Sequence, residues 1–183
     1  MSSVARQNLE AQLADFDELM AARDAICSTG AGRPARRQGA AVIRGGVLLL
    51  SAAFEGYVED VFDLAADLIL AGYPHSVRKQ FKKDTSGRLN NADVRKVNML
   101  FFNIGIPWIM GHPKLHWRKF TNKSVQDTLN ALIGARNSNA HGKPRSVRKT
   151  RARFWRNFIA RLGDKLDEIV SDEVASVTGS RPW

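Results

Sequence analysis

Two residues of the chain carry side chains that could together cleave RNA. Arg136 and His141 lie five positions apart in the segment Arg-Asn-Ser-Asn-Ala-His. RNA can be cut without a metal ion when its own 2′-hydroxyl attacks the adjacent phosphate. A histidine suits the necessary proton transfer because its pKa lies near neutrality. An arginine suits the phosphate because its guanidinium stays charged and holds two oxygens in a planar fork.

The spacing of the two residues limits how they can meet. Five residues of continuous α-helix rotate by about 500°, so the side chains of Arg136 and His141 would point about 140° apart. They converge if the helix unwinds near His141, as Gly142 and Pro144 suggest, or if a second protomer brings its own copy alongside. The second arrangement predicts a homodimer with a composite active site.

The other histidines offer no comparable site. His112 and His116 have the spacing of two metal ligands on one helix, but Pro113 separates them and no acidic residue lies nearby. His75 has no visible partner. Cys27 is the only cysteine, which excludes an internal disulfide and a cysteine-based zinc site and fits a reducing compartment. We therefore expect neither a metal ion nor another cofactor.

Positive charge is concentrated around the Arg/His segment. The chain has 28 Lys and Arg against 18 Asp and Glu, a net charge of +10. Residues 71–163 hold 20 of the basic residues and 3 of the acidic ones, or +17, and no acidic residue lies between Asp127 and Asp164. Such a field attracts polyanions such as RNA. The alternative is that these basic helices present ordinary solvated faces.

Several neighbouring residues could assist the pair. Asn137 could orient His141 or a phosphate, or could simply cap the end of the helix. Glu55 could pair with Arg136 and hold it in place, or could pair with another arginine. Six basic residues could attract the RNA backbone, with a solvated face as the alternative reading: Lys143, Arg145, Arg148, Lys149, Arg151 and Arg153.

Apolar residues at spacings of three, four and seven predict helices along most of the chain. Long helices are expected over about 3–28, 35–71, 122–141 and 145–174. Short helices are expected over about 75–83 and 93–103. Residues 104–120 mix two prolines and two glycines with apolar residues, which predicts an ordered loop packed by Trp108 and Trp117.

Some core residues can also be predicted. Leu48, Ala52 and Leu68 should belong to the buried face of the second long helix, and Phe154 should face inward from the last one. Gly45 and Gly46 would each weaken the second helix by about 1 kcal/mol relative to alanine. We therefore expect a kink or a close helix crossing at these glycines.

These elements predict one all-α domain over residues 1–183, an antiparallel helical bundle of four long helices plus short ones. The longest apolar stretch, 47–53, is too short to span a bilayer. The N-terminus lacks the layout of a signal peptide. The basic run 143–161 lacks the exposed apolar stripe of a membrane-lying helix. We expect a soluble, cytoplasmic protein that does not bind membranes.

Two segments resemble a known superfamily. Residues 132–142, Leu-Ile-Gly-Ala-Arg-Asn-Ser-Asn-Ala-His-Gly, look like the Arg-x4-6-His motif of HEPN domains, in which a polar residue commonly follows the arginine. Residues 46–60 resemble the long helix of the RiboL-PSP-HEPN-like and related stand-alone HEPN families. In these families an acidic residue, here Glu55, sits inside an otherwise apolar helix. The resemblance covers about residues 35–170.

The resemblance implies a helical homodimer with metal-independent endoribonuclease activity, often in toxin–antitoxin or phage-defence systems. Arg136 and His141 would be its catalytic pair, and the products would carry a 2′,3′-cyclic phosphate and a 5′-hydroxyl. RNA is then the expected partner, and a cognate antitoxin protein is a further candidate. Two other functions remain open on the same scaffold: a non-catalytic RNA- or DNA-binding or assembly module, and a structural protein whose basic surface docks an acidic partner.

Overall fold

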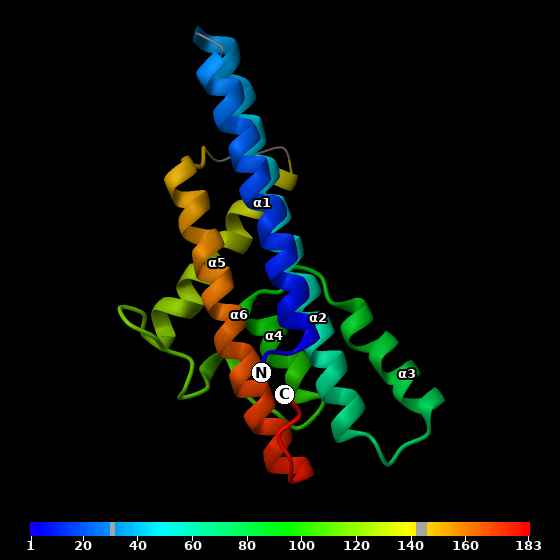
Figure 1. The fold of residues 1–183 in the computed structure, drawn as a ribbon. Helices are drawn as coiled ribbons and strands as arrows, with labels where there is room; N and C mark the ends of the chain where they lie inside the picture. Colours follow the sequence, from blue (N-terminus) through cyan, green and yellow to red (C-terminus); the bar gives the residue numbers. More distant parts are fainter. Residues whose placement is uncertain (30–31, 142–145) are drawn as a thin grey trace.

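Six α-helices and two 3-10 helices form the part of the chain that the computed structural model describes, residues 1–29, 32–141 and 146–183 (Figure 1). No strand occurs within these ranges, and Trp117 and Phe120 make an isolated bridge. The expectation of an all-α fold with four long helices is confirmed. The elements in order are α1 (Val4–Thr29), α2 (Gly32–Ile69), α3 (His75–Asp84), η1 (Ser86–Arg88), α4 (Val94–Phe102), η2 (Ile109–Gly111), α5 (Asn122–Ala140) and α6 (Lys149–Thr178).

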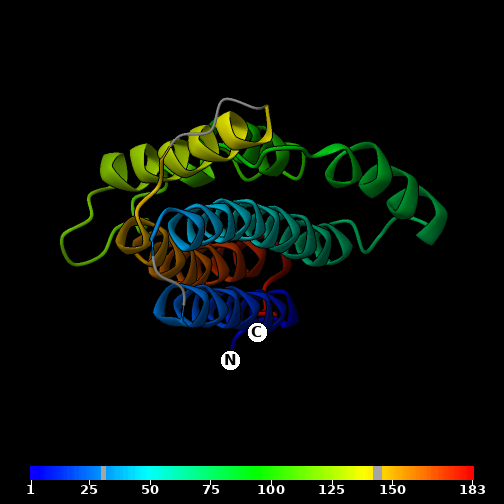
Figure 2. The ribbon, with the colours of Figure 1, turned by 90° about the horizontal axis from the view of Figure 1, so that it is seen from above.

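The long helices pack around α2. The α1 and α2 helices form an antiparallel hairpin, and α6 packs against both of them. Figure 2 shows α4 and α5 as a layer on the side of α2 that faces away from α1, with α3 extending to one side. The two termini lie close together in both views. The side chain of Asp167 on α6 ties down the N-terminus, because it accepts a hydrogen bond from the Ser3 backbone N–H at 3.0 Å.

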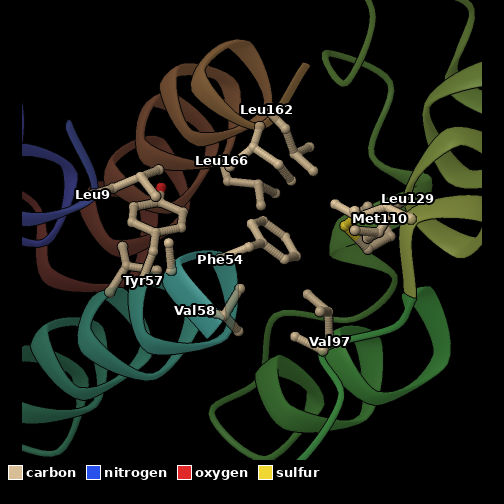
Figure 3. Packing of buried hydrophobic residues seen from close by; sticks show 14 of the residues in the cluster. Leu9, Phe54, Tyr57, Val58, Val97, Met110, Leu129, Leu162 and Leu166 are labelled. Atoms are coloured by element: carbon tan, nitrogen blue, oxygen red, sulfur yellow. The ribbon is translucent and has the colours of Figure 1, made fainter. Parts of the chain in front are cut away.

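The buried face of α2 supplies the centre of the core. Phe54 and Tyr57 lie among leucines of α1 and α6, whereas Val58 lies toward Val97 of α4 (Figure 3). The Tyr57 hydroxyl donates a hydrogen bond to the Gly163 carbonyl at 2.9 Å, which satisfies its polar atom in the interior. Burial also raises the pKa of this hydroxyl well above its usual value.

Three residues of α2 were wrongly expected in the core. Leu48 and Leu68 are 38% and 40% exposed, and Ala52 is also exposed. Leu48 and Ala52 lie on one side of the helix, together with half-buried Glu55. Their exposure shows that no helix among the described residues covers that side. The spacing of apolar residues correctly predicted which face of α2 is buried, but the predicted face was too wide.

Gly46 marks the close crossing of α1 and α2. A Cβ atom at this position would lie 2.9 Å from both Phe16 Cε2 and Met20 Cε, which is too close for a real contact. Gly45 meets nothing within 4 Å and faces solvent. The expected close crossing is therefore confirmed for Gly46, whereas Gly45 plays no part in it.

The segment between α4 and α5 is an ordered loop, as predicted. Met110 is buried, its N–H donates to Asn98 Oδ1 at 2.8 Å, and its carbonyl accepts from Asn122 Nδ2 at 3.0 Å. Trp117 packs on Phe120 with 5.0 Å between the ring centroids. The other tryptophan of the loop, Trp108, was wrongly expected to pack there, because it is 74% exposed.

One helix among the described residues, α2 from Pro34 to Ile69, is long and apolar enough to cross a membrane by composition alone. Half of its apolar 18-residue window is buried inside the bundle. Such burial is typical of the central helix of a soluble protein, and the structure is consistent with one.

Candidate active site

Helix α5 places the Arg/His pair. Its N-cap is Thr121, whose hydroxyl accepts a hydrogen bond from the Ser124 N–H at 3.2 Å. Val125, Leu129 and Leu132 are fully buried and fix the helix against the core. The motif is therefore carried by a rigid element rather than by a loop.

The helix continues without a break to the end of the motif. The last helical residue is Ala140, and the His141 N–H still donates to the Asn137 carbonyl at 3.0 Å. Unwinding near His141 was one of the two predicted ways for the side chains to meet. The helix does end there, since His141 has a non-helical φ of −94° and ψ of 23°, but the backbone from Arg136 to Ala140 stays helical. The side chains of Arg136 and His141 therefore leave the helix about 140° apart. Gly142 and Pro144 lie outside the described residues.

Arg136 is half-buried and free of carboxylates. Its Nη1 donates to Asn137 Oδ1 at 3.2 Å, and it forms no ion pair with any residue that the structure describes. The proposed pairing with Glu55 is not formed, although Glu55 is half-buried on α2. A guanidinium with no carboxylate partner retains its capacity to bind an anion.

Asn137 connects the two members of the pair. Its side chain holds the guanidinium of Arg136, and its backbone carbonyl accepts the N–H of His141. The side chain of Asn137 thus contacts Arg136 rather than His141, and the residue that caps the helix is His141. His141 itself is exposed, so its imidazole is accessible to a substrate.

Asn139 is a candidate site residue that sequence reasoning missed. Neither polar atom of its side-chain amide has a hydrogen-bond partner within the described structure, although both atoms are buried. An unpaired buried amide destabilises the fold. Asn139 lies three residues after Arg136, on nearly the same side of α5. The signal in the sequence was a second asparagine inside the motif.

The predicted RNA-binding residues divide into three groups. Lys143 and Arg145 lie outside the described residues. The Lys149 ammonium binds the Asp24 carboxylate, and Arg153 Nη2 lies 3.5 Å from Asp24 Oδ2. The hydrogen bond from Lys149 is the main reason that the pKa of Asp24 lies below its usual value. These two basic side chains join α6 to α1.

The remaining two lie at the start of α6. The Arg151 guanidinium stacks on the rings of Phe154 and Trp155, at 4.9 and 5.1 Å from their centroids. Trp155 is buried, but Phe154 is 37% exposed and was wrongly placed in the core. Arg148 is exposed and makes no ion pair with a described residue. It is therefore the described member of the set that is most available to a phosphate.

No metal site accompanies the motif in the described structure. No group of three or more His, Cys, Asp or Glu side chains converges there. His112 Nε2 lies 3.3 Å from Glu173 Oε1, and His116 Nδ1 lies 2.8 Å from the Pro113 carbonyl. The two histidines thus contact different parts of the chain rather than a common centre.

A groove between α4 and α5 reaches the motif at Asn137. It encloses about 1430 Å³. Its walls include Arg95, Met99, Phe102 and Trp108. The sequence did not predict this groove, because it depends on how the loop 104–120 packs between the two helices.

No curated protein and no solved structure matches the chain. A comparison with protein-family models gives one match, RiboL-PSP-HEPN, over residues 15–172. The matched range runs from α1 into α6 and contains both Arg136 and His141. Because it spans more than half of the chain, the protein belongs to the RiboL-PSP-HEPN family and has a HEPN-type domain.

Proposed function

We propose that the protein is a metal-independent endoribonuclease with Arg136 and His141 as its catalytic pair. The observation that carries the proposal is the Arg/His pair at the C-terminal end of α5, with an exposed imidazole and a guanidinium that no described carboxylate neutralises. Membership of a HEPN family supports a function in RNA or nucleotide chemistry. We further propose that the protein acts in the cytoplasm as a toxin or phage-defence effector, with a cognate antitoxin as its regulator.

The two side chains have different tasks in this reaction. The 2′-oxygen forms a bond to phosphorus as its proton passes to a base or to solvent, and the P–O5′ bond breaks. His141 donates a proton to the leaving 5′-oxygen as a general acid. The guanidinium of Arg136 stabilises the charge on the non-bridging oxygens.

An EDTA-resistant cleavage assay tests this function. Purified protein incubated with single-stranded RNA and EDTA is expected to give fragments that end in a 2′,3′-cyclic phosphate and begin with a 5′-hydroxyl. Mass spectrometry of the fragments distinguishes these ends from a 3′-hydroxyl and a 5′-phosphate. Salt-dependent RNA binding without any turnover would instead identify a non-catalytic binding module.

We propose in addition that the working site is formed by two protomers. The unbroken helix directs Arg136 and His141 away from each other, so one α5 presents only one of the two groups to a given phosphate. A two-fold axis near this helix would place the arginine of one protomer beside the histidine of its partner.

Mixing two inactive variants tests the composite site. A heterodimer of Arg136→Ala and His141→Ala contains one site with both mutations and one site with neither. Unfolding and refolding an equal mixture is expected to restore about a quarter of wild-type activity, because half of the dimers are mixed and each has one intact site. If each protomer held its own complete site, the mixture would remain as inactive as either variant alone.

A further inference from the structure

The groove between α4 and α5 has an apolar and aromatic rim. Met99, Phe102 and Trp108 are 57%, 68% and 74% exposed, and all three line the groove. Leu100 and Ile133, which are buried in the core, also line it. Large apolar side chains gathered on one exposed surface are a sign of a binding site.

Trp108 has a backbone conformation that bulky residues rarely adopt. Its φ is 55° and its ψ is 37°, in the left-handed region. Trp108 is the N-cap of η2, and its carbonyl accepts a hydrogen bond from the Gly111 N–H at 2.6 Å. The indole of Trp108 is exposed to solvent at the edge of the groove. Backbone strain that exposes a side chain instead of burying it points to a functional role.

One face of α5 leads along the groove to the catalytic candidates. Gln126, Asn130 and Asn137 line the groove at spacings of four and seven residues, which keeps them on one side of the helix. The next position on that side is His141, four residues after Asn137. The groove is therefore aligned with the imidazole, whereas Arg136 does not line it and only donates a hydrogen bond to Asn137.

The charge of the groove suits phosphate groups. Arg95 forms no ion pair with a described residue, and the Lys96 ammonium is held by oxygens of Asn90, which carry no charge. Both carboxylates of the lining are already engaged. Asp93 caps α4 by accepting the Lys96 N–H at 2.9 Å, and Asp84 binds Arg88 at 2.7 Å. Two cations therefore remain without a carboxylate partner.

We propose that the groove binds a single-stranded segment of RNA. Bases stack on Phe102 and Trp108, phosphates lie near Arg95 and Lys96, and the strand continues past Asn137 to His141. Only an unpaired strand can offer its base faces to exposed aromatic rings, which is why the occupant is single-stranded. The row of amides along α5 and the two unpaired cations favour this ligand over an apolar protein surface. The inference rests on the proposed function.

The test measures binding separately from cleavage. The probe is a fluorescein-labelled 2′-O-methyl RNA of about 12 nucleotides, a length chosen to span a groove that contacts several bases. It lacks the attacking 2′-hydroxyl and cannot be cut by this route. Fluorescence anisotropy of full-length wild-type protein gives the reference Kd.

Trp108→Ala is expected to raise the Kd about tenfold or more, as for the loss of a base-stacking contact. Trp108→Asn should cause the same loss while tolerating the left-handed backbone, and Trp108→Phe should recover part of the binding. Tyr73→Ala is the matched control, because Tyr73 is 60% exposed but does not line the groove. Its Kd should stay within about twofold of wild type.

An unchanged Kd in both Trp108→Ala and Trp108→Asn would overturn the inference. So would sedimentation showing that these variants dissociate a wild-type dimer, because the surface would then be an interface between copies. Equally tight binding of a duplex of the same sequence would contradict the single-strand assignment. If the wild-type protein fails to cleave RNA but the Trp108 variants still bind the probe more weakly than wild type, the RNA-binding groove is supported and only the nuclease proposal fails.

Discussion

Replacement of His141 by alanine is expected to reduce EDTA-resistant RNA cleavage by about 100- to 10,000-fold, the usual contribution of a positioned general acid or base. The loss should fall mainly on kcat, because the imidazole acts on the leaving oxygen in the transition state. Single-turnover cleavage of a labelled RNA measures the effect directly. Binding of the uncleavable probe should change far less.

The fold should not suffer from this change, since the His141 side chain is exposed and its backbone N–H bond to Asn137 does not need the imidazole. Its free energy of unfolding should stay within about 0.5 kcal/mol of wild type. His116→Ala is the matched control, because His116 is also exposed and lies away from the motif. Wild-type cleavage by His141→Ala, with His116→Ala equally active, would remove His141 from the mechanism.

Replacement of Gly46 by leucine is expected to lower the free energy of unfolding by about 2–3 kcal/mol. Even a Cβ at this position would lie 2.9 Å from the Phe16 ring and from Met20 Cε, so the longer side chain must push α1 away from α2. The Tm should fall by about 5–10 °C in a chain of this size. Urea unfolding followed by far-ultraviolet circular dichroism measures the change.

Gly45→Leu is the adjacent control. Gly45 faces solvent with nothing within 4 Å of its Cβ position, so the leucine meets no neighbour. Its higher helix propensity should raise the stability by about 0.5–1 kcal/mol. A loss of stability in Gly46→Leu together with a gain in Gly45→Leu would place the helix crossing at Gly46. Equal losses at both positions would mean that α1 lies differently from the structure.

The helices could be predicted closely because burial in a bundle repeats with the helical period. The first was expected over 3–28 and runs from Val4 to Thr29, and the second was expected over 35–71 and runs from Gly32 to Ile69. The end of α6 was placed four residues early, although Gly179 gave a usable signal. Its φ of 79° is the left-handed conformation that commonly ends a helix.

The surroundings of the site were harder to predict, because they depend on contacts between distant parts of the chain. Lys149 is bound by Asp24, 125 residues away. The spacing of apolar residues along the helices does not predict such an ion pair. Glu55 and Arg136 fall on suitable helices, but the relative rotation of α2 and α5 decides whether they touch. Predicting the groove would have required knowing the conformation of the loop 104–120, whose glycines and prolines allow many conformations.

The unbroken end of α5 has a consequence for how such an enzyme would be controlled in a cell. If Arg136 and His141 must come from different protomers, newly made chains are harmless until enough of them accumulate to pair. Activity would then rise with roughly the square of abundance while protomers are scarce. A small change in synthesis or degradation would thus be amplified into a sharp switch between tolerance and damage, without any conformational change in the protomer.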